Sequence, residues 1–150
     1  MSKEVKIKVL SVNTSSKKGI VKTPVNFIEL SLNGIEGDAH AGDWHRQVSM
    51  LASESIKTHE QLAGRKIEYG EFAENITTEG MLLFEAKPGD RFVNKNVELE
   101  LTQIGKKCHG DNCAIYREVG NCVMPKQGIF CKVIKPGIIK SGDVLNYIPK

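Results

Sequence analysis

Short stretches in which apolar and polar residues alternate run through much of this sequence. Residues 5–9 read VKIKV and residues 97–101 read VELEL. A period of two places every second side chain on one face of a strand, so both stretches predict half-buried strands. Further short apolar runs bounded by Gly, Pro, Asn or Asp predict strands at 25–32, 76–78, 91–93, 128–134 and 144–148. Many short strands indicate a barrel or a sandwich.

Helical periodicity is much rarer than strand periodicity in this chain. One helix is predicted to start at Ser53, which can cap it, and to run to Leu62. Ile56, His59 and Leu62 recur at helical spacing, so we expect them to share one face. A second helical pattern covers 114–119. The sequence therefore predicts a mostly β fold with a few short helices.

The length and the N-terminal sequence bound the class of protein. A chain of 150 residues suits one compact domain, and no Pro-, Gly- or Ser-rich linker divides it, so we expect residues 1–150 to form a single domain. Residues 1–12 interleave charged with apolar residues and lack the continuous apolar core of a signal peptide. No apolar run is long enough to cross a membrane. We expect a cytoplasmic protein with no membrane partner.

The charge pattern argues against a nucleic-acid partner. The chain has 21 Lys and Arg and 18 Asp and Glu, a net charge of +3, and the basic residues are scattered among the acids. Aromatic residues make up only 6% of the chain, and stacking platforms for bases need such residues interleaved with basic ones. A mildly positive protein of this kind suits a phosphorylated small molecule better.

A glycine-rich segment at 34–50, GIEGDAHAGDWHRQVSM, concentrates polar and titratable side chains. His40 and His45 flank Trp44, and Arg46 follows. Arg46 could bind a phosphate through its forked guanidinium, and His40 could act as a neutral donor. The alternative is that Trp44 anchors an ordinary loop whose neighbours are solvated.

A second polar segment, EFAENITTEG at 71–80, places Glu74 and Asn75 just before a predicted strand. The Asn75 amide offers two donors and an acceptor to a heterocyclic ligand. The alternative is a simple turn before the strand.

The four cysteines have different sequence contexts. Without a secretion signal we expect reduced thiols. Cys131 alternates within GIFCKVI in a strand pattern, which predicts a small core residue. Cys108 follows Lys106 and Lys107, and nearby cations favour the thiolate form, which acts as a nucleophile or a soft-metal ligand. Cys108 could also be an unremarkable loop cysteine.

A zinc site is another possible role for the cysteine-rich region. Cys108, Cys113 and Cys122, together with His109, could bind zinc, although their spacing is unusual for a structural site.

The order of these motifs resembles the MOSC domain, a family named for the C-terminal domain of molybdenum cofactor sulfurase. The resemblance runs from about Gly34 to Asp143. It is carried by GIEGDAHAG followed by R-x-VSM, then EFAENITTEG, PGDRF, ELTQIGKKC and GIFCKVIKPGIIKSGDV. AENI at 73–76 is similar to the GENL motif of the family, and a cysteine follows the TQ strand. The resemblance is specific because all of these motifs occur in this order, and no single motif would be enough.

The resemblance implies a MOSC-like β-barrel that binds the molybdenum cofactor, a pterin dithiolene with a terminal phosphate. Cys108 would be the catalytic or metal-ligating residue, binding molybdenum or handling its sulfur ligand. Asp38 and His40, with Arg46, would hold the pterin or the phosphate, and Asn75 would help to line the pocket. Members commonly have Arg and Pro before the cysteine, where this chain has two lysines.

The resemblance leaves two main functions open. The chain contains neither the pyridoxal phosphate domain of the sulfurase nor the N-terminal β-barrel of amidoxime-reducing relatives, so we expect a stand-alone module. It would carry or sulfurate the cofactor for a biosynthetic or target enzyme. Alternatively, it would reduce N-hydroxylated substrates with electrons from a separate reductase. No cysteine spacing typical of an iron–sulfur relay is present, which favours the carrier. A zinc-thiolate structural module is the third alternative.

Overall fold

Strands form most of the fold, which confirms the predicted mostly β class. The computed structural model describes residues 5–17, 21–39, 41–105 and 127–150. The strands are β1 (Val5–Thr14), β2 (Thr23–Val25), β3 (Phe27–Ser31), β4 (Gly34–Ile35), β5 (Val48–Ala52), β6 (Ile76–Glu79), β7 (Arg91–Val93), β8 (Glu98–Ile104), β9 (Ile129–Lys135), β10 (Gly137–Lys140) and β11 (Val144–Ile148). The helices are α1 (Ser53–Ala63) and the short 3-10 helix η1 (Leu83–Glu85).

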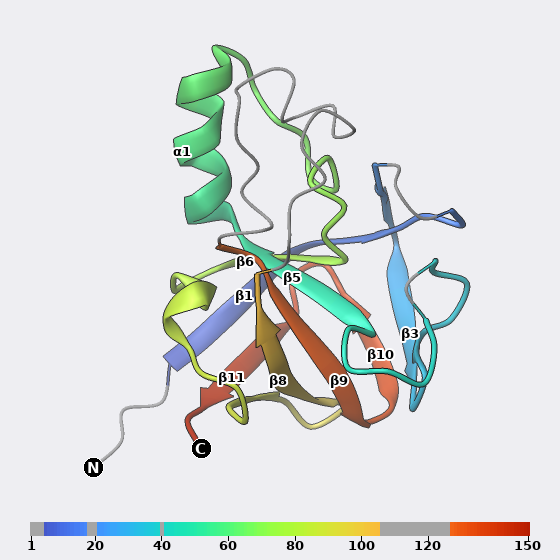
Figure 1. The fold of residues 1–150 in the computed structure, drawn as a ribbon. Helices are drawn as coiled ribbons and strands as arrows, with labels where there is room; N and C mark the ends of the chain where they lie inside the picture. Colours follow the sequence, from blue (N-terminus) through green and yellow to red (C-terminus); the bar gives the residue numbers. More distant parts are fainter. Residues whose placement is uncertain (1–4, 18–20, 40, 106–126) are drawn as a thin grey trace.

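Seven of the described strands close into a barrel (Figure 1). Their order is β11-β7-β8-β9-β5-β6-β1, and β1 pairs with β11 to complete the ring. Only β5 and β6 are parallel among these neighbours. β2 adds to the far end of β1, and β10, β3 and β4 form a separate small sheet. Closure leaves no long unpaired edge on the barrel.

The barrel interior is filled by the apolar residues that the alternation predicted. Ile7 and Val9 on β1 are 0% exposed, as are Leu99 and Leu101 on β8. Full burial of one such side chain stabilises the fold by about 1.5–3 kcal/mol. Cys131 on β9 is also fully buried, as predicted. The interior further includes Val12, Met50, Ile76, Phe92, Ile129 and Leu145.

Three strands, the two-residue β4 together with β5 and β10, escaped prediction because they lack a simple alternation. All five residues of β5 are buried, on both faces, so no polar residue marks an outer face. Val48 and Met50 join the barrel core, and Leu51 on the other face is also 0% exposed. β10 pairs with β3 outside the barrel. The predicted strand at 25–32 divides into β2 and β3, which belong to different sheets.

Helix α1 differs from the prediction in its cap and in its face. Ala52 is the N-cap and gives no side-chain hydrogen bond, so Ser53 is the first helical residue and not the cap. Ile56 and His59 are buried as expected, but Leu62 is 61% exposed. The buried residues all lie in the first two turns, and Figure 1 shows the rest of α1 projecting from the barrel. The predicted helix at 114–119 lies outside the described residues.

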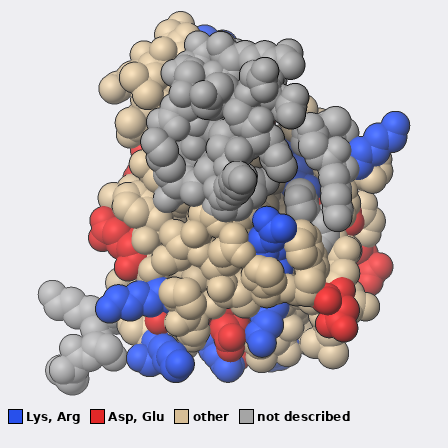
Figure 2. Space-filling view, in the orientation of Figure 1, with Lys and Arg blue, Asp and Glu red and all other residues tan. Residues whose placement is uncertain are grey.

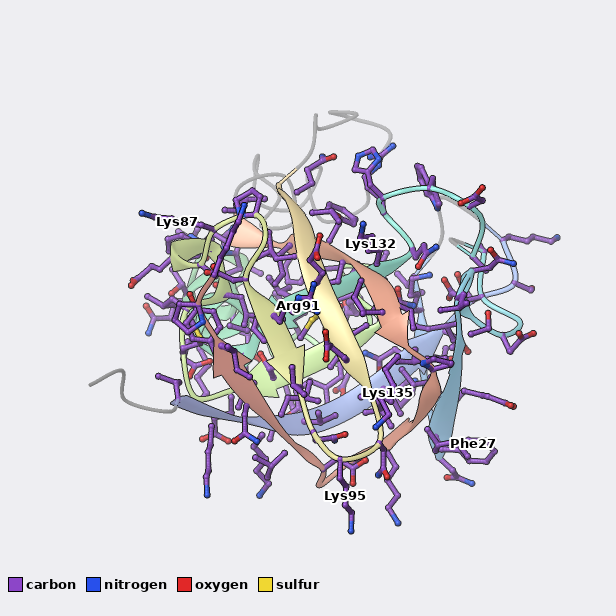
Figure 3. The ribbon with its side chains drawn as sticks, turned by 90° about the horizontal axis from the view of Figure 1, so that it is seen from below. Phe27, Lys87, Arg91, Lys95, Lys132 and Lys135 are labelled. Atoms are coloured by element: carbon purple, nitrogen blue, oxygen red, sulfur yellow. The ribbon has the colours of Figure 1, made fainter. Side chains whose placement is uncertain are left out.

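The outer face of β7, β8 and β9 carries a ladder of opposite charges. Arg91 on β7 pairs with Glu98 and Glu100 on β8, and Lys132 on β9 lies 3.7 Å from Glu100. Figure 3 shows Arg91 and Lys132 on these neighbouring strands. On the face shown in Figure 2, basic and acidic side chains are likewise interspersed. Exposed pairs of this kind contribute up to about 1 kcal/mol each.

Among the described residues, no helix has both the length and the apolar character that a membrane crossing requires.

Candidate functional site

Arg46 packs its guanidinium against two aromatic rings where β9 begins. Its Cζ atom lies 4.6 Å from the centroid of Trp44 and 5.7 Å from that of Phe130, distances at which ring faces attract a cation. The Thr102 hydroxyl contacts the main-chain carbonyls of His45 and Phe130, the latter at 3.0 Å. The Nε atom of Arg46 is buried and has no hydrogen-bond partner among the described residues. A buried N–H without an acceptor is costly, so this guanidinium is suited to an oxygen atom that a ligand supplies.

At the same corner of the barrel, a main-chain hydrogen bond connects the residues on either side of 106–126. The N–H of Gly105, just after β8, donates to the carbonyl of Gly128, just before β9, at 2.7 Å. Gln103 Nε2 donates to the Gly105 carbonyl at 2.6 Å, and Gln103 Oε1 lies 2.7 Å from Nε2 of the exposed His45. His45 and Gln103 therefore link the glycine-rich loop to the strand end that leads to Cys108.

Gln47 fixes the end of the glycine-rich loop with a buried amide. Its Nε2 donates to the carbonyls of Leu32 and Gly42, both at 2.9 Å, and its Oε1 accepts from the Val133 N–H at 2.9 Å. The amide thus holds Arg46, its neighbour in the chain, against β9. Sequence reasoning missed Gln47. Its signal is a polar residue directly before the buried strand β5.

Asp38 uses its carboxylate within the protein. Its Oδ1 lies 2.8 Å from Lys22 Nζ, with both side chains 0% exposed, and accepts from the Ser15 N–H at 3.1 Å. The pair joins the glycine-rich loop to the segment between β1 and β2. Removing one partner of a buried ion pair costs about 3–5 kcal/mol, so Asp38 supports this loop. Direct contact of Asp38 with a cofactor stays a prediction.

Asn75 likewise bonds to the protein itself. Its Oδ1 accepts from the N–H and the hydroxyl of Ser49 on β5, at 3.0 and 3.1 Å. Its Nδ2 donates to the carbonyl of Asn13 on β1 at 3.1 Å, and the residue is 0% exposed. Asn75 therefore ties β1, β5 and the start of β6 together. Its place in the lining of a cofactor pocket stays a prediction.

Glu74 and Ala73, which precede Asn75, carry two further unusual features. Glu74 is 0% exposed, its Oε2 accepts from the Thr77 hydroxyl at 2.8 Å, and its Oε1 has no partner among the described residues. Burial raises the pKa of the Glu74 carboxyl above its usual range. Ala73 has a φ of +64°, a left-handed conformation that favours glycine. The GENL motif of the family has its glycine at this position.

The predicted site residues fall into three groups. Arg46 lies where β9 begins, and its buried Nε has no hydrogen-bond partner among the described residues. Asp38 and Asn75 are internal supports of the segments around it. His40 and Cys108 lie outside the described residues.

The zinc alternative also depends on residues that are not described. Cys113, Cys122 and His109 lie outside the described part of the chain. Within the described part, no group of three or more His, Cys, Asp or Glu residues could hold a metal ion.

Sequence reasoning missed two residues that complete this corner, Gln103 and Phe130. Gln103 interrupts the alternation of β8, and Phe130 pairs with it across to β9. That interruption is the one sequence signal for Gln103. Nothing in the sequence around Phe130 distinguishes it from an ordinary core residue.

Several solved structures have the same fold. The YuaD protein from Bacillus subtilis aligns with a TM-score of 0.81 and 19% identity, over 100% of both chains. YiiM from Geobacillus stearothermophilus aligns with a TM-score of 0.74 and 23% identity, over 95% of this chain and 75% of that one. YiiM from Escherichia coli aligns with a TM-score of 0.65 and 18% identity, over 99% of this chain and 71% of that one. At these identities the likeness shows the fold. No curated protein matches the sequence.

The family itself is shown by sequence. The profile of the MOSC domain matches residues 37–146, which include the glycine-rich loop, the AENI motif and Cys108. The match covers well over half of the chain, and the closed barrel agrees with it. The chain belongs to the MOSC domain family.

Proposed function

We propose that this protein binds the molybdenum cofactor and acts as a cofactor carrier or sulfur-handling protein. The observation that carries the proposal is Arg46, a guanidinium stacked on Trp44 and Phe130 whose buried Nε has no acceptor among the described residues. The cofactor of this family ends in a phosphate, and phosphate oxygens form strong charge-assisted hydrogen bonds with a guanidinium. Membership of the MOSC family supports the same ligand.

The other predicted residues would complete the site in different ways. Cys108 would ligate the metal or handle its sulfur ligand, because Lys106 and Lys107 beside it favour a soft thiolate. When bound, the cofactor would supply a molybdenum centre for sulfur transfer or redox chemistry. His40 would donate to the pterin or the phosphate, and Asp38 and Asn75 would hold the surrounding segments in place.

Metal and pterin analysis tests the proposal directly. The protein is purified from a host that makes the cofactor, and molybdenum, zinc and pterin are measured per chain. We expect molybdenum and pterin in equal amounts. Zinc alone, without pterin, would contradict the proposal and support the zinc-thiolate module.

Three variants separate the roles of the residues. Cys108→Ser should lose molybdenum, whereas Cys131→Ala should keep it, because Cys131 is buried in the barrel core. Arg46→Ala should bind the cofactor about 10- to 100-fold more weakly, the usual effect of losing a hydrogen bond to a charged group. Unchanged cofactor retention in Arg46→Ala would show that Arg46 does not contact it.

Reduction of N-hydroxylated substrates is a second candidate, favoured by His45. This exposed imidazole bonds to Gln103 near the end of β8, and an imidazole in that place can pass a proton to a substrate bound beside it. Reductive cleavage of an N–O bond consumes two electrons from a separate reductase and two protons, and releases water. His45→Asn should then slow turnover while leaving the molybdenum content unchanged. A carrier would instead activate a cofactor-free acceptor enzyme, and His45→Asn should activate that enzyme as well as the wild type does.

A further inference from the structure

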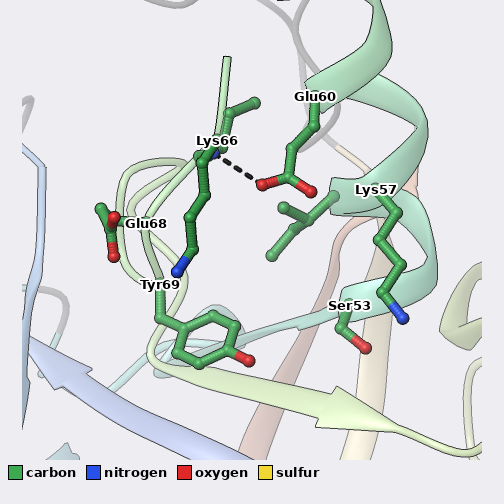
Figure 4. Close-up of a pocket in the computed structure, with 8 residues that line it drawn as sticks. Ser53, Lys57, Glu60, Lys66, Glu68 and Tyr69 are labelled. Carbon is green, nitrogen blue, oxygen red and sulfur yellow. Dashed lines mark hydrogen bonds between the residues drawn. The ribbon is translucent and has the colours of Figure 1, made fainter.

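A cavity of about 220 Å³ lies between helix α1 and the loop that follows it, in a region that the proposed cofactor site does not use. One wall consists of residues of α1 and the other of residues of the loop (Figure 4). The lining residues are Ser53, Ile56, Lys57, Glu60, Lys66, Ile67, Glu68 and Tyr69. A cavity of roughly 150 Å³ can hold one benzene ring, so this one can hold a ring and a small polar group.

Three interactions fix the walls of the cavity. Glu60 Oε2 accepts from the Ile67 N–H at 2.8 Å, which ties the helix to the loop, as the dashed line in Figure 4 shows. Within the loop, Arg65 forms a two-pronged pair with Glu71, at 3.1 and 2.9 Å, and Glu71 also accepts from the Glu68 N–H at 2.8 Å. The cavity is therefore built into the fold in the absence of a ligand.

Hydrogen-bond donors outnumber available acceptors around the cavity. Among the described residues, the ammonium groups of Lys57 and Lys66 make no ion pair, and the Tyr69 hydroxyl makes no hydrogen bond. One oxygen of the Glu60 carboxylate, Oε2, already accepts from the main chain. In Figure 4 the Glu68 carboxylate points away from α1. A ligand oxygen that carries negative charge would satisfy these donors.

The remaining lining is apolar and suits a flat ring. Ile56 and Ile67 are 3% and 2% exposed, and they belong to the two different walls, Ile56 to α1 and Ile67 to the loop. Figure 4 shows the Tyr69 ring at the lower edge of the lining. The two lysines are balanced by Glu60 and Glu68, so the lining carries no formal net charge, which disfavours a doubly charged ligand such as a phosphate dianion.

We propose that this cavity binds a small aromatic carboxylate. The ring packs between Ile56 and Ile67, and the carboxylate accepts from Lys57, Lys66 and the Tyr69 hydroxyl. The site is separate from the corner around Arg46, so its test does not depend on cofactor binding.

Amide chemical shifts of the full chain, titrated with benzoate, test the proposal. Benzyl alcohol keeps the ring without the charge, and acetate keeps the charge without the ring. We expect saturable shifts at Ser53, Lys57, Ile67 and Tyr69 with benzoate, and a dissociation constant in the millimolar range for so small a ligand. The two control compounds should bind at least about tenfold more weakly.

Variants of exposed lysines supply the matched comparison. Lys57→Gln and Lys66→Gln should each weaken benzoate binding by about three- to tenfold, in line with a partly exposed charge-assisted hydrogen bond. Lys6→Gln, on the exposed side of β1, should leave it unchanged. Three results would each overturn the proposal. They are an equal weakening of benzoate binding in all three variants, control compounds that bind as well as benzoate, and no saturable shift at a benzoate concentration about ten times the expected dissociation constant.

Discussion

Asn75→Ala tests whether the AENI motif supports the site or contacts its ligand. The side chain bonds the main-chain N–H of Ser49 and the main-chain carbonyl of Asn13, and all three residues are 0–2% exposed. Alanine leaves both main-chain groups buried without this partner. Each such group costs about 1–3 kcal/mol, so the variant should lose roughly 2–6 kcal/mol of unfolding free energy. A domain of this size has only about 5–15 kcal/mol in total.

Urea unfolding followed by circular dichroism measures this loss, with an unchanged m-value expected if only stability changes. Ser49→Ala is the matched control, because it removes hydroxyl contacts to Asn75 and Ala73 but keeps the Ser49 N–H bonded, and it should lose about 1 kcal/mol. A loss below about 1 kcal/mol in Asn75→Ala, combined with loss of cofactor retention, would refute the supporting role and indicate a direct ligand contact.

Four further predictions concern other buried or strained residues. Lys22→Ala should lose about 3–5 kcal/mol in urea unfolding because it removes one partner of a buried ion pair; a loss below about 1 kcal/mol would argue against a tight pair. Burial tends to raise the pKa of Asp90, but hydrogen bonds from a tyrosine hydroxyl and two main-chain N–H groups hold it below its usual 3.8. Asp90→Asn should therefore destabilise the protein above pH 4, and the difference from wild type should shrink as the pH falls through the lowered pKa; a pH-independent difference would contradict this. Burial raises the pKa of Glu74 above 4.5, so the wild type should lose stability as the pH rises from 4.5 towards the raised pKa. Glu74→Gln has no carboxyl to ionise, so its thermal unfolding should show no such loss over the same pH range. Ala73→Gly should stabilise the protein by up to about 1 kcal/mol in the same assay, because glycine adopts positive φ without strain; a destabilised variant would show that the alanine methyl makes a compensating contact.

The strands that alternation could predict are those with one face in the barrel and one in solvent. β1 and β8 alternate because their outer residues meet water, whereas β5 is covered on both faces and carries no alternation. The stretch 25–32 divides into two strands because its two parts join different sheets. Those sheets are set by partners far away in the sequence, β1 for β2 and β10 for β3. Helix α1 was located correctly, but the extent of its buried face depends on how far it reaches beyond the barrel.

Three of the Gly-Asp pairs in the sequence, at 37–38, 89–90 and 142–143, show a similar limit for side-chain roles. In all three, the aspartate N–H bonds to the carbonyl three residues earlier, at 3.0–3.1 Å. Asp90 and Asp143 also close their own turns, accepting from the N–H of Lys87 and Lys140. Asp38 instead reaches Lys22, whose position beside it results from the fold of another segment. Local sequence specifies the turn but not the long-range partner.

The candidate site follows the same rule. Arg46 and Trp44 are two residues apart, so their association could be expected from the sequence. Phe130 and Gln103 reach the same corner through the pairing of β8 and β9, and no local pattern relates them to Arg46.

The hydrogen bond between Gly105 and Gly128 has a consequence for how this barrel can diversify. β8 and β9 are paired up to these two residues, so their pairing is complete on both sides of residues 106–126. For a flexible connection, doubling the length changes the free energy of closing it by only about 0.6 kcal/mol. Insertions and exchanges between Gly105 and Gly128 should therefore have little effect on the stability of the barrel. Lys106 and Lys107, which stand where relatives commonly have Arg and Pro, are changes of this kind.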